Sequence, residues 1–364
     1  MTAPWSTRAV DALRGDLFHV AAGQVLPAVG DPVDLDVAAC EVVFDDGWSP
    51  HVQATLTAKV PEAQATLDAI DPRTGTQVLI RTGYKYPGGL DDVHDLALLQ
   101  LRERPVRRPA NTMALRAESA EARLSDLTPL GDTHNYGATV TCAAVIADVL
   151  DWALDVTLAT TLVSSATIGE AMAITTGADL WGALHDLADR IGGWLYADAA
   201  GTWHLDPWPD TIGRSAYIMD VGTGGNLEET EAVLAVDEWG NAVLLDYGDD
   251  VYGWATATSG PFAVGDVPTK VVTLKRQTTA PGTQAGRNAA AAAVLARVLS
   301  RGRGFTLTGP AAYWLRPGHT LTARLPTGPQ ERHLVSRVAF DLATGTMTVR
   351  TRVPDADTTI TTGA

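Results

Sequence analysis

Residues 181–209 read WGALHDLADRIGGWLYADAAGTWHLDPWP, and this stretch predicts an amphipathic helix that runs directly into an aromatic hairpin. Apolar side chains recur at helical spacing from Trp181 to Ile191. The pair Gly192–Gly193 then ends the helix, because glycine adopts a left-handed φ at little cost. Two short strands follow around the turn Ala199–Gly201. The pattern is typical of a packing element and contains no nucleophile, metal-binding or phosphate-binding motif.

The alternation of large side chains in the two strands predicts which face of the hairpin covers the helix. The residues expected on that face are Trp194, Tyr196, Trp203 and Leu205. The side chains named as packing anchors, and not as catalytic residues, are Trp181, Trp194, Tyr196 and Trp203. Replacing a buried Trp194 by Ala is then expected to cost about 3–5 kcal/mol of stability.

The length of 364 residues predicts two or three domains, and the pattern of the whole chain predicts an α+β, mainly β fold. Strand-like runs separated by Gly, Pro and Asp clusters fill most of the chain, and helices are predicted at residues 139–152, 179–192 and 284–301. The expected domains are a first β-barrel over 1–116, an α/β insertion with the aromatic hairpin over 117–212, a second β-barrel with the Ala-rich helix over 213–353, and a flexible tail over 354–364.

The two cysteines and the apolar segments point to a reducing compartment. Cys40 and Cys142 match no zinc or redox spacing, so buried thiols are expected. The most apolar segment, residues 138–154, contains two aspartates and is shorter than a membrane span. The first twenty residues carry charges where a secretory signal needs apolar side chains. We therefore expect a chain made in the cytoplasm, without membrane insertion.

The net charge of −16 is distributed unevenly along the sequence. Residues 1–116 carry −4, residues 117–266 carry −21, and residues 267–364 carry +9. The acidic middle and the basic end are expected to attract one another between neighbouring subunits. Sequence-wide nucleic-acid binding is disfavoured because the acidic part would repel phosphates.

Motifs that carry chemistry are weak throughout the chain. The clusters Asp91–Asp95 and Asp246–Asp250 offer carboxylates for a cation but read equally well as solvated turns. The loop Gly222–Asn226 resembles half of a dinucleotide fingerprint, but Leu227 stands at the final glycine position. Acidic residues that in principle suit a glycosidase are Glu228, Glu229, Glu231, Asp237 and Glu238. We expect no catalytic, cofactor-binding or metal-binding residue and no cofactor.

The order of the elements resembles that of phage tail hub or baseplate hub proteins, a group of minor tail proteins of tailed phages and related phage-tail-like particles. The phrases that carry this resemblance are LADRIGGWLYADAAGTWHLDPWP at 187–209, AAAAVLARVLSR at 290–301 and HLVSRVAFDLATGTMTVRTR at 333–352. The resemblance covers about the last two thirds of the chain. Residues 1–116 match by strand content alone.

The resemblance implies two tube-like β-barrel domains with an α/β insertion, assembled as a homotrimer. Such a ring adapts a sixfold tail tube to a threefold tail tip and leaves a channel for DNA passage. It further implies a structural virion component at the tail tip, assembled in the host cytoplasm and without enzymatic activity. The implied partners are a tail tube or distal tail protein, a tail tip or central fibre protein, a tape measure protein, and DNA in transit.

Two other functions remain open from the sequence. One is a tail-tip cell-wall hydrolase. The other is a monomeric glycan-binding module that would use an exposed tryptophan such as Trp239 or Trp254.

Overall fold

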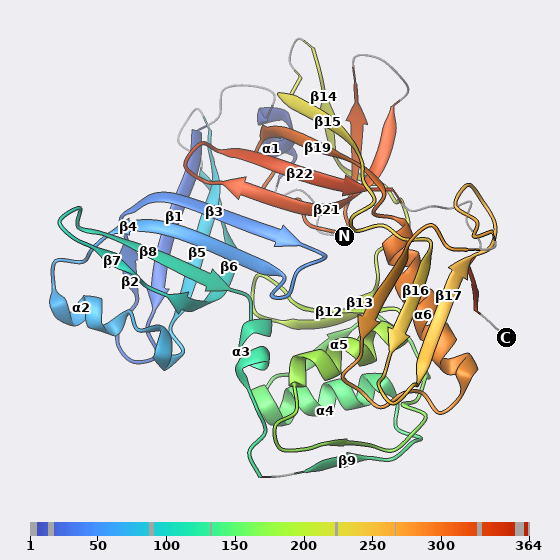
Figure 1. Cartoon of the computed structure of the whole chain (residues 1–364). Helices are drawn as coiled ribbons and strands as arrows, with labels where there is room; N and C mark the ends of the chain where they lie inside the picture. Colours follow the sequence, from blue (N-terminus) through green and yellow to red (C-terminus); the bar gives the residue numbers. More distant parts are fainter. Residues whose placement is uncertain are drawn as a thin grey trace.

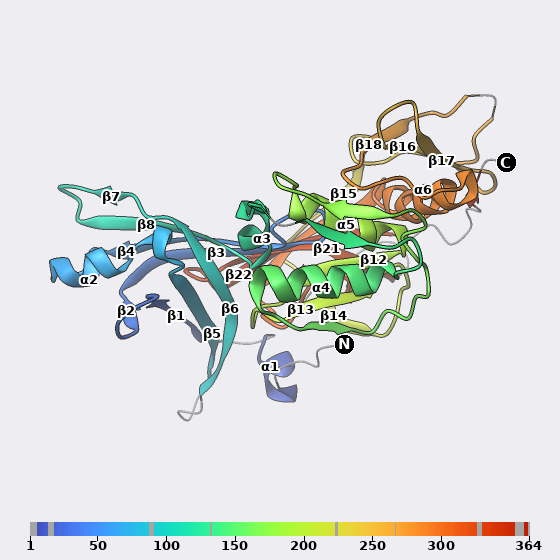
Figure 2. The same cartoon turned by 90° about the horizontal axis from the view of Figure 1, so that it is seen from below.

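The computed structural model describes residues 6–13, 18–86, 91–131, 133–222, 225–265, 267–325, 330–353 and 360–362. Three hydrophobic clusters divide these residues into a large sheet, a helical module and a smaller sheet with a helix. Figure 2 shows strands β1 to β8 at one side of the molecule, the smaller sheet with helix α6 at the opposite side, and the helical module between them.

The large sheet has fourteen strands drawn from both ends of the chain. Its main path is β15-β19-β22-β21-β3-β4-β8-β6-β5-β1-β2, with β7, β14 and β20 attached to its side. The strands are β1 (Phe18–Leu26), β2 (Val33–Leu35), β3 (Val37–Asp45), β4 (Val52–Lys59), β5 (Gln77–Lys85), β6 (Asp91–Glu103), β7 (Val106–Arg107), β8 (Thr112–Glu118), β14 (Ser215–Asp220), β15 (Glu229–Leu234), β19 (Arg303–Pro310), β20 (Thr320–Arg324), β21 (Glu331–Asp341) and β22 (Thr346–Arg352).

The pairing of β3 with β21 joins the N-terminal and C-terminal strands into one sheet (Figure 1). Phe44 lies opposite Val338 in this antiparallel ladder, and the Phe44 and Phe340 rings meet edge to face, with centroids 6.1 Å apart. Strands from 1–116 and from 213–353 therefore share a single core. The two separate β-barrels are not confirmed, because within the described residues no sheet closes on itself.

Short helices lie beside the N-terminal strands. They are α1 (Thr7–Ala12), α2 (Gln64–Ala69) and the 3₁₀ turn η1 (Pro72–Thr74). The strands themselves follow the expected period of two, and β4 buries every second residue, beginning with Val52. Ala9 of α1 and Leu67 of α2 add buried side chains to the core of the large sheet.

The helical module contains α3 (Glu121–Asp126), α4 (Cys142–Leu154), α5 (Leu180–Arg190) and strands β9 (His134–Tyr136), β10 (Leu158–Thr160), β11 (Met172–Ile174), β12 (Gly193–Ala197) and β13 (Trp203–Pro207). Both long helices begin at side-chain caps: Thr141 accepts from the Ala144 amide, and Asp179 accepts from the Gly182 amide. Helix α5 gives way to β12 through Gly192, at φ 64°. The predicted helices at 139–152 and 179–192 are confirmed within a few residues.

The register of the hairpin differs from the prediction. Tyr196 lies opposite His204, and Ala197 lies opposite Trp203. Trp194 and Tyr196 therefore share one face with His204, whereas Trp203 and Leu205 share the other face with Leu195 and Ala197. Only the second group belongs to the buried cluster that includes α5. The expectation that all four large side chains cover the helix is wrong, because the turn from 198 to 202 sets the opposite parity.

The smaller sheet contains β18 (Val271–Lys275), β16 (Ala242–Asp246), β17 (Tyr252–Ala257) and β23 (Ile360–Thr362), in that order, and α6 (Gln284–Leu299) packs on it. Gly253 permits the close approach of strand and helix, since a Cβ there would lie 2.5 Å from the Arg287 carbonyl oxygen. The predicted helix at 284–301 is confirmed. The tail expected over 354–364 contains a paired strand at 360–362, and its other residues lie outside the described ones.

The hairpin register makes a stability prediction. Trp203 is 1% exposed, so Trp203→Ala is expected to lower the free energy of unfolding by about 3–5 kcal/mol. Trp194 is only half-buried, so Trp194→Ala is expected to cost less. Urea unfolding followed by circular dichroism measures both. A larger loss at Trp194 than at Trp203 would contradict the register.

Candidate functional site at the junction of the sheet and the helical module

A row of stacked rings lies on the hairpin face that points away from α5. The rings of Trp194 and Tyr196 stack with centroids 4.2 Å apart, and those of Tyr196 and His204 with centroids 5.2 Å apart. His51, which directly precedes β4, meets the Trp194 ring edge to face at 4.9 Å. The ring row therefore connects the helical module to the large sheet.

The tip of the hairpin is fixed at both of its ends. Asp198 accepts hydrogen bonds of 2.9 Å from the amides of Ala200 and Thr202. The Leu98 amide of β6 donates to the Ala199 carbonyl at 2.7 Å. Because the turn is bound to itself and to β6, the ring row has a fixed position relative to the sheet.

A cavity of about 750 Å³ lies between the ring row, the large sheet and the loop that follows β19. We call it the junction cavity. Its lining includes Phe44, Leu98, Trp194, Tyr196 and Arg316. These residues come from four separate segments of the chain, and no short motif in the sequence connects them.

A buried histidine, His51, and a half-buried one, His319, line the junction cavity. Burial lowers the pKa of His51 to about 4, although its 2.7 Å hydrogen bond with the Asp45 carbonyl acts in the opposite direction. Burial together with the Arg316 charge lowers the pKa of His319 to about 4. Both imidazoles are therefore neutral at pH 7.

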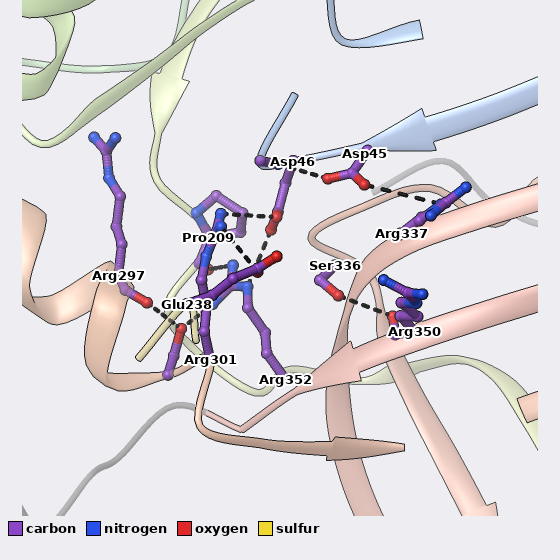
Figure 3. A network of polar contacts seen from close by, with 12 residues as sticks. Asp45, Asp46, Pro209, Glu238, Arg297, Arg301, Ser336, Arg337, Arg350 and Arg352 are labelled. Carbon is purple, nitrogen blue, oxygen red and sulfur yellow. Dashed lines mark hydrogen bonds and ion pairs between the residues drawn. The ribbon is translucent and has the colours of Figure 1, made fainter. Parts of the chain in front are cut away.

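A buried ion pair joins Asp46, which follows β3, to Arg352 at the end of β22 (Figure 3). Arg352 Nε donates to Asp46 Oδ2 at 3.0 Å, and both side chains are at most 2% exposed. Arg352 also donates to the Ser300 hydroxyl at 3.2 Å and to the Pro209 carbonyl. Burial raises the pKa of Asp46, against the opposing charges of Arg352 and Arg301. The pair thus connects the ends of β3 and β22 with the end of α6 and the residues after β13.

A second buried ionic group joins α5 to the smaller sheet and α6. Arg276 Nη1 lies 2.7 Å from Asp186 Oδ1 and 2.8 Å from Asp189 Oδ2, and Arg297 also contacts Asp189. Burial raises the pKa of Asp189, but the nearby charges of Arg297, His185 and Arg276 outweigh it and hold the pKa well below its usual range. Asp189 therefore stays ionised at neutral pH.

These ion pairs join residues of the acidic middle of the sequence to residues of its basic end. The carboxylates of Asp186 and Asp189 belong to the acidic middle, and the guanidinium groups of Arg276 and Arg297 belong to the basic end. Arg324 lies 3.7 Å from Asp220 in the same way. The expected attraction between middle and end thus operates within one chain at these positions.

The other sequence candidates form turns and strand surfaces. In the Asp91–Asp95 cluster, Asp92 accepts from Ser6 at 2.9 Å and from Tyr86 at 3.2 Å. Asp246 accepts from the Gly248 amide at 2.9 Å and so closes a turn. Asn226 accepts from the Asp220 amide at 2.9 Å, and residues 223–224 of the Gly222–Asn226 candidate lie outside the described residues. Among the described residues, no group of three His, Cys, Asp or Glu is arranged to hold a metal ion.

The remaining candidates are either surface residues or core residues. The acidic residues Glu228, Glu229, Glu231, Asp237 and Glu238 are exposed. Cys40 and Cys142 are buried free thiols, and burial raises the pKa of both. Trp239 is buried in the core of the smaller sheet, whereas Trp254 is 39% exposed. No described helix is long and apolar enough to cross a membrane.

The Asp46–Arg352 pair predicts a large effect of a single substitution. Arg352→Met leaves the buried Asp46 carboxylate with only the 3.4 Å contact of Arg301 and is expected to destabilise the chain by about 3–5 kcal/mol in urea unfolding. Arg350→Met, two residues earlier in β22 and exposed, is the matched control and is expected to change stability by less than about 1 kcal/mol. An equal loss of unfolding free energy in the two variants would contradict the stabilising role of the buried pair.

His51 predicts a pH dependence of stability. Its pKa is lowered in the folded chain, so the unfolded chain binds the proton more tightly and stability falls as the pH drops from about 6.5 to 4. The loss amounts to about 3 kcal/mol for a shift of this size. Urea unfolding of the wild type and His51→Gln across this range isolates the contribution. Parallel pH profiles would contradict the prediction.

Comparison with known proteins identifies the fold. No protein-family model matches the sequence, and no curated protein matches it. A tail protein from Neisseria meningitidis MC58 superposes with a TM-score of 0.65 at 12% identity, over 91% of this chain and 96% of that chain. The 43 kDa tail protein of prophage MuSo2 from Shewanella oneidensis gives a TM-score of 0.62 at 11% identity, over 92% and 98%.

A third match is a chain of a protein complex. The structure of a Francisella PdpA–VgrG complex gives a TM-score of 0.57 at 8% identity, over 93% of this chain and 59% of that chain. At identities this low, the superpositions establish the fold alone, and the function has to be argued separately. The resemblance to tail hub proteins is confirmed at that level, and the chain has the fold of phage and prophage tail proteins.

Proposed function

We propose that this chain is a structural component of a phage tail or baseplate and forms its hub, as a ring of three subunits at the distal end of the tail tube. The observation that carries the proposal is the match to two tail proteins over more than nine tenths of both chains. In such a ring, the N-terminal and the C-terminal strands of the large sheet would each supply one unit per subunit, so that three subunits present six units to a sixfold tube. The other side would accept a threefold tip.

The edge of the large sheet supports assembly through strand β15. This strand stands at the end of the sheet path and pairs with β19 alone. Five of its six residues are exposed, and Leu234 is 82% exposed. An exposed edge with an apolar side chain is a template for pairing with another chain. We assign β15 to the contact between subunits.

The exposed acidic residues suit a channel. Glu228, Glu229 and Glu231 lie on or beside β15, and none of them takes part in an ion pair among the described residues. A lumen with the charge of these carboxylates would repel DNA phosphates and keep DNA from adhering during passage. The proposal therefore places the acidic surface around β15 toward the channel.

The proposed partners follow from this position in the tail. They are a tail tube or distal tail protein on one side, a tail tip or central fibre protein on the other, and a tape measure protein within the tube. The chain would be assembled in the host cytoplasm and reside in the virion at the tail tip. The proposal includes no enzymatic activity, in line with the structural tail proteins that share the fold.

Light scattering across a concentration series tests the ring. The expected mass is about 115 kDa, three times the 38.4 kDa of one chain, with rings visible in negative stain. Leu234→Asp places a charge on the exposed edge of β15 without disturbing the core, so association is expected to weaken at least tenfold, which corresponds to about 1.4 kcal/mol.

Val163→Asp is the matched control for this experiment. Val163 is 98% exposed in the helical module, away from the sheet edge, and its substitution is expected to leave the trimer intact. A protein that stays monomeric at every concentration would contradict the self-assembled ring. Equal weakening by both variants would contradict the assignment of β15.

A further inference from the structure

Arg316 is the charged residue of the junction cavity that lacks a carboxylate partner. Its Nη1 donates to the carbonyls of Tyr313 at 2.6 Å and Leu315 at 2.8 Å, and its Cζ lies 4.1 Å from the centre of the Phe44 ring. Burial lowers the pKa of Arg316 to about 10, and the charge of Asp198 opposes this shift. The guanidinium therefore remains charged at pH 7, at a site where charge is poorly solvated.

The carboxylates that line the same cavity are already engaged. Asp95 pairs with Arg81 at 2.8 Å. Asp198 lies 3.0 Å from His204 Nε2 and accepts the amides of its own turn.

Asp206 is the third carboxylate of the lining, and it accepts from the Tyr196 hydroxyl at 3.0 Å. None of the ion pairs among the described residues includes Arg316, although Asp198 is near enough to act on it through space.

The hydrogen-bonding pattern of Arg316 leaves one edge of the guanidinium available. Both hydrogen bonds of the side chain use Nη1, and Nε and Nη2 donate no hydrogen bond to any part of the chain that the structure describes. The Nε–Nη2 edge is one that pairs with both oxygens of a carboxylate in a bidentate manner. The site thus has an unused anion-binding edge next to a cavity.

The remaining walls of the junction cavity are mainly apolar. They include Leu26, Leu79 and Leu98 from the sheet and the rings of Trp194 and Tyr196 from the hairpin. A volume of about 750 Å³ lies in the range of small-molecule pockets, which combine apolar walls with a few polar groups that fix orientation. The cavity has this composition.

We propose that the junction cavity binds an organic carboxylate, whose two oxygens take the Nε–Nη2 edge of Arg316 and whose apolar body lies along Leu98 and the ring row. The carboxylate belongs either to a free small acid or to an acidic side chain of a partner polypeptide. Binding at this site stands apart from the proposed ring, because its residues lie within one chain and do not include β15.

Matched probes test the carboxylate requirement by isothermal titration calorimetry. The first pair is indole-3-acetate and the uncharged indole-3-acetamide, which have nearly the same shape. The second pair is the acetylated, amidated tripeptide Leu-Glu-Leu and its Leu-Gln-Leu counterpart. At least one acid is expected to bind at least tenfold more tightly than its amide. Binding of the small acid identifies a free ligand, and binding of the peptide alone identifies a partner segment.

Variants test the role of Arg316 in that binding. Arg316→Gln removes the charge, so the affinity for the acid is expected to fall at least tenfold. Arg316→Lys keeps the charge but removes the paired N–H donors of the guanidinium, so a smaller loss of affinity is expected. Leu98→Trp fills the cavity while Arg316 stays in place, and it is expected to abolish binding. Arg332→Gln, at an exposed arginine outside the cavity, is the control and is expected to bind as the wild type.

The proposal fails on either of two results. One is that neither acid binds more tightly than its amide. The other is that folded Arg316→Lys and Leu98→Trp variants, checked by circular dichroism, bind the acid as tightly as the wild type. If Arg316→Gln does not fold, these two variants decide the outcome.

Discussion

The buried pair of Asp46 and Arg352 is the contact on which the arrangement of the three parts depends. Removing both groups from water is costly, so the pair is favourable only with good geometry and further hydrogen bonds. Arg352 meets this condition through the Ser300 hydroxyl and the Pro209 carbonyl. Because a guanidinium is planar and rigid, these partners must approach it in one arrangement. The ends of β3, β22, α6 and the hairpin are thereby held at fixed relative positions.

The two faces of the hairpin pack against different parts of the molecule. One face places Trp203 in the core of the helical module, and the other places the stacked rings of Trp194 and Tyr196 against His51 of the large sheet. A shift of one residue in the pairing would exchange the two faces. The five-residue turn with Asp198 at its start prevents this shift, because its hydrogen bonds fix the parity. The same ring row forms one wall of the junction cavity.

Local patterns predict the helices of this chain and fail at pairings between distant segments. The cap at Asp179 and the stop at Gly192 are readable in sequence, and α5 has nearly the expected bounds. The hairpin register is not readable from alternation alone, because β12 offers apolar side chains on both of its faces. The pairing of β3 with β21 depends on the arrangement of the whole chain, and the expectation of two separate barrels does not include it. Arg316 carries no signal in sequence, since its importance comes from neighbours in distant segments.

The joint between β3 and β21 has a consequence for the order in which this chain folds. Residues 37–45 pair with β4 on one side, but their second partner, residues 331–341, is synthesised nearly 300 positions later. The helical module, in contrast, has its partners close in sequence and can form early during synthesis. Until then the N-terminal strands keep an open edge that is prone to aggregation. A chain that ends before β21 therefore cannot complete the large sheet, because it lacks the strand that pairs with β3.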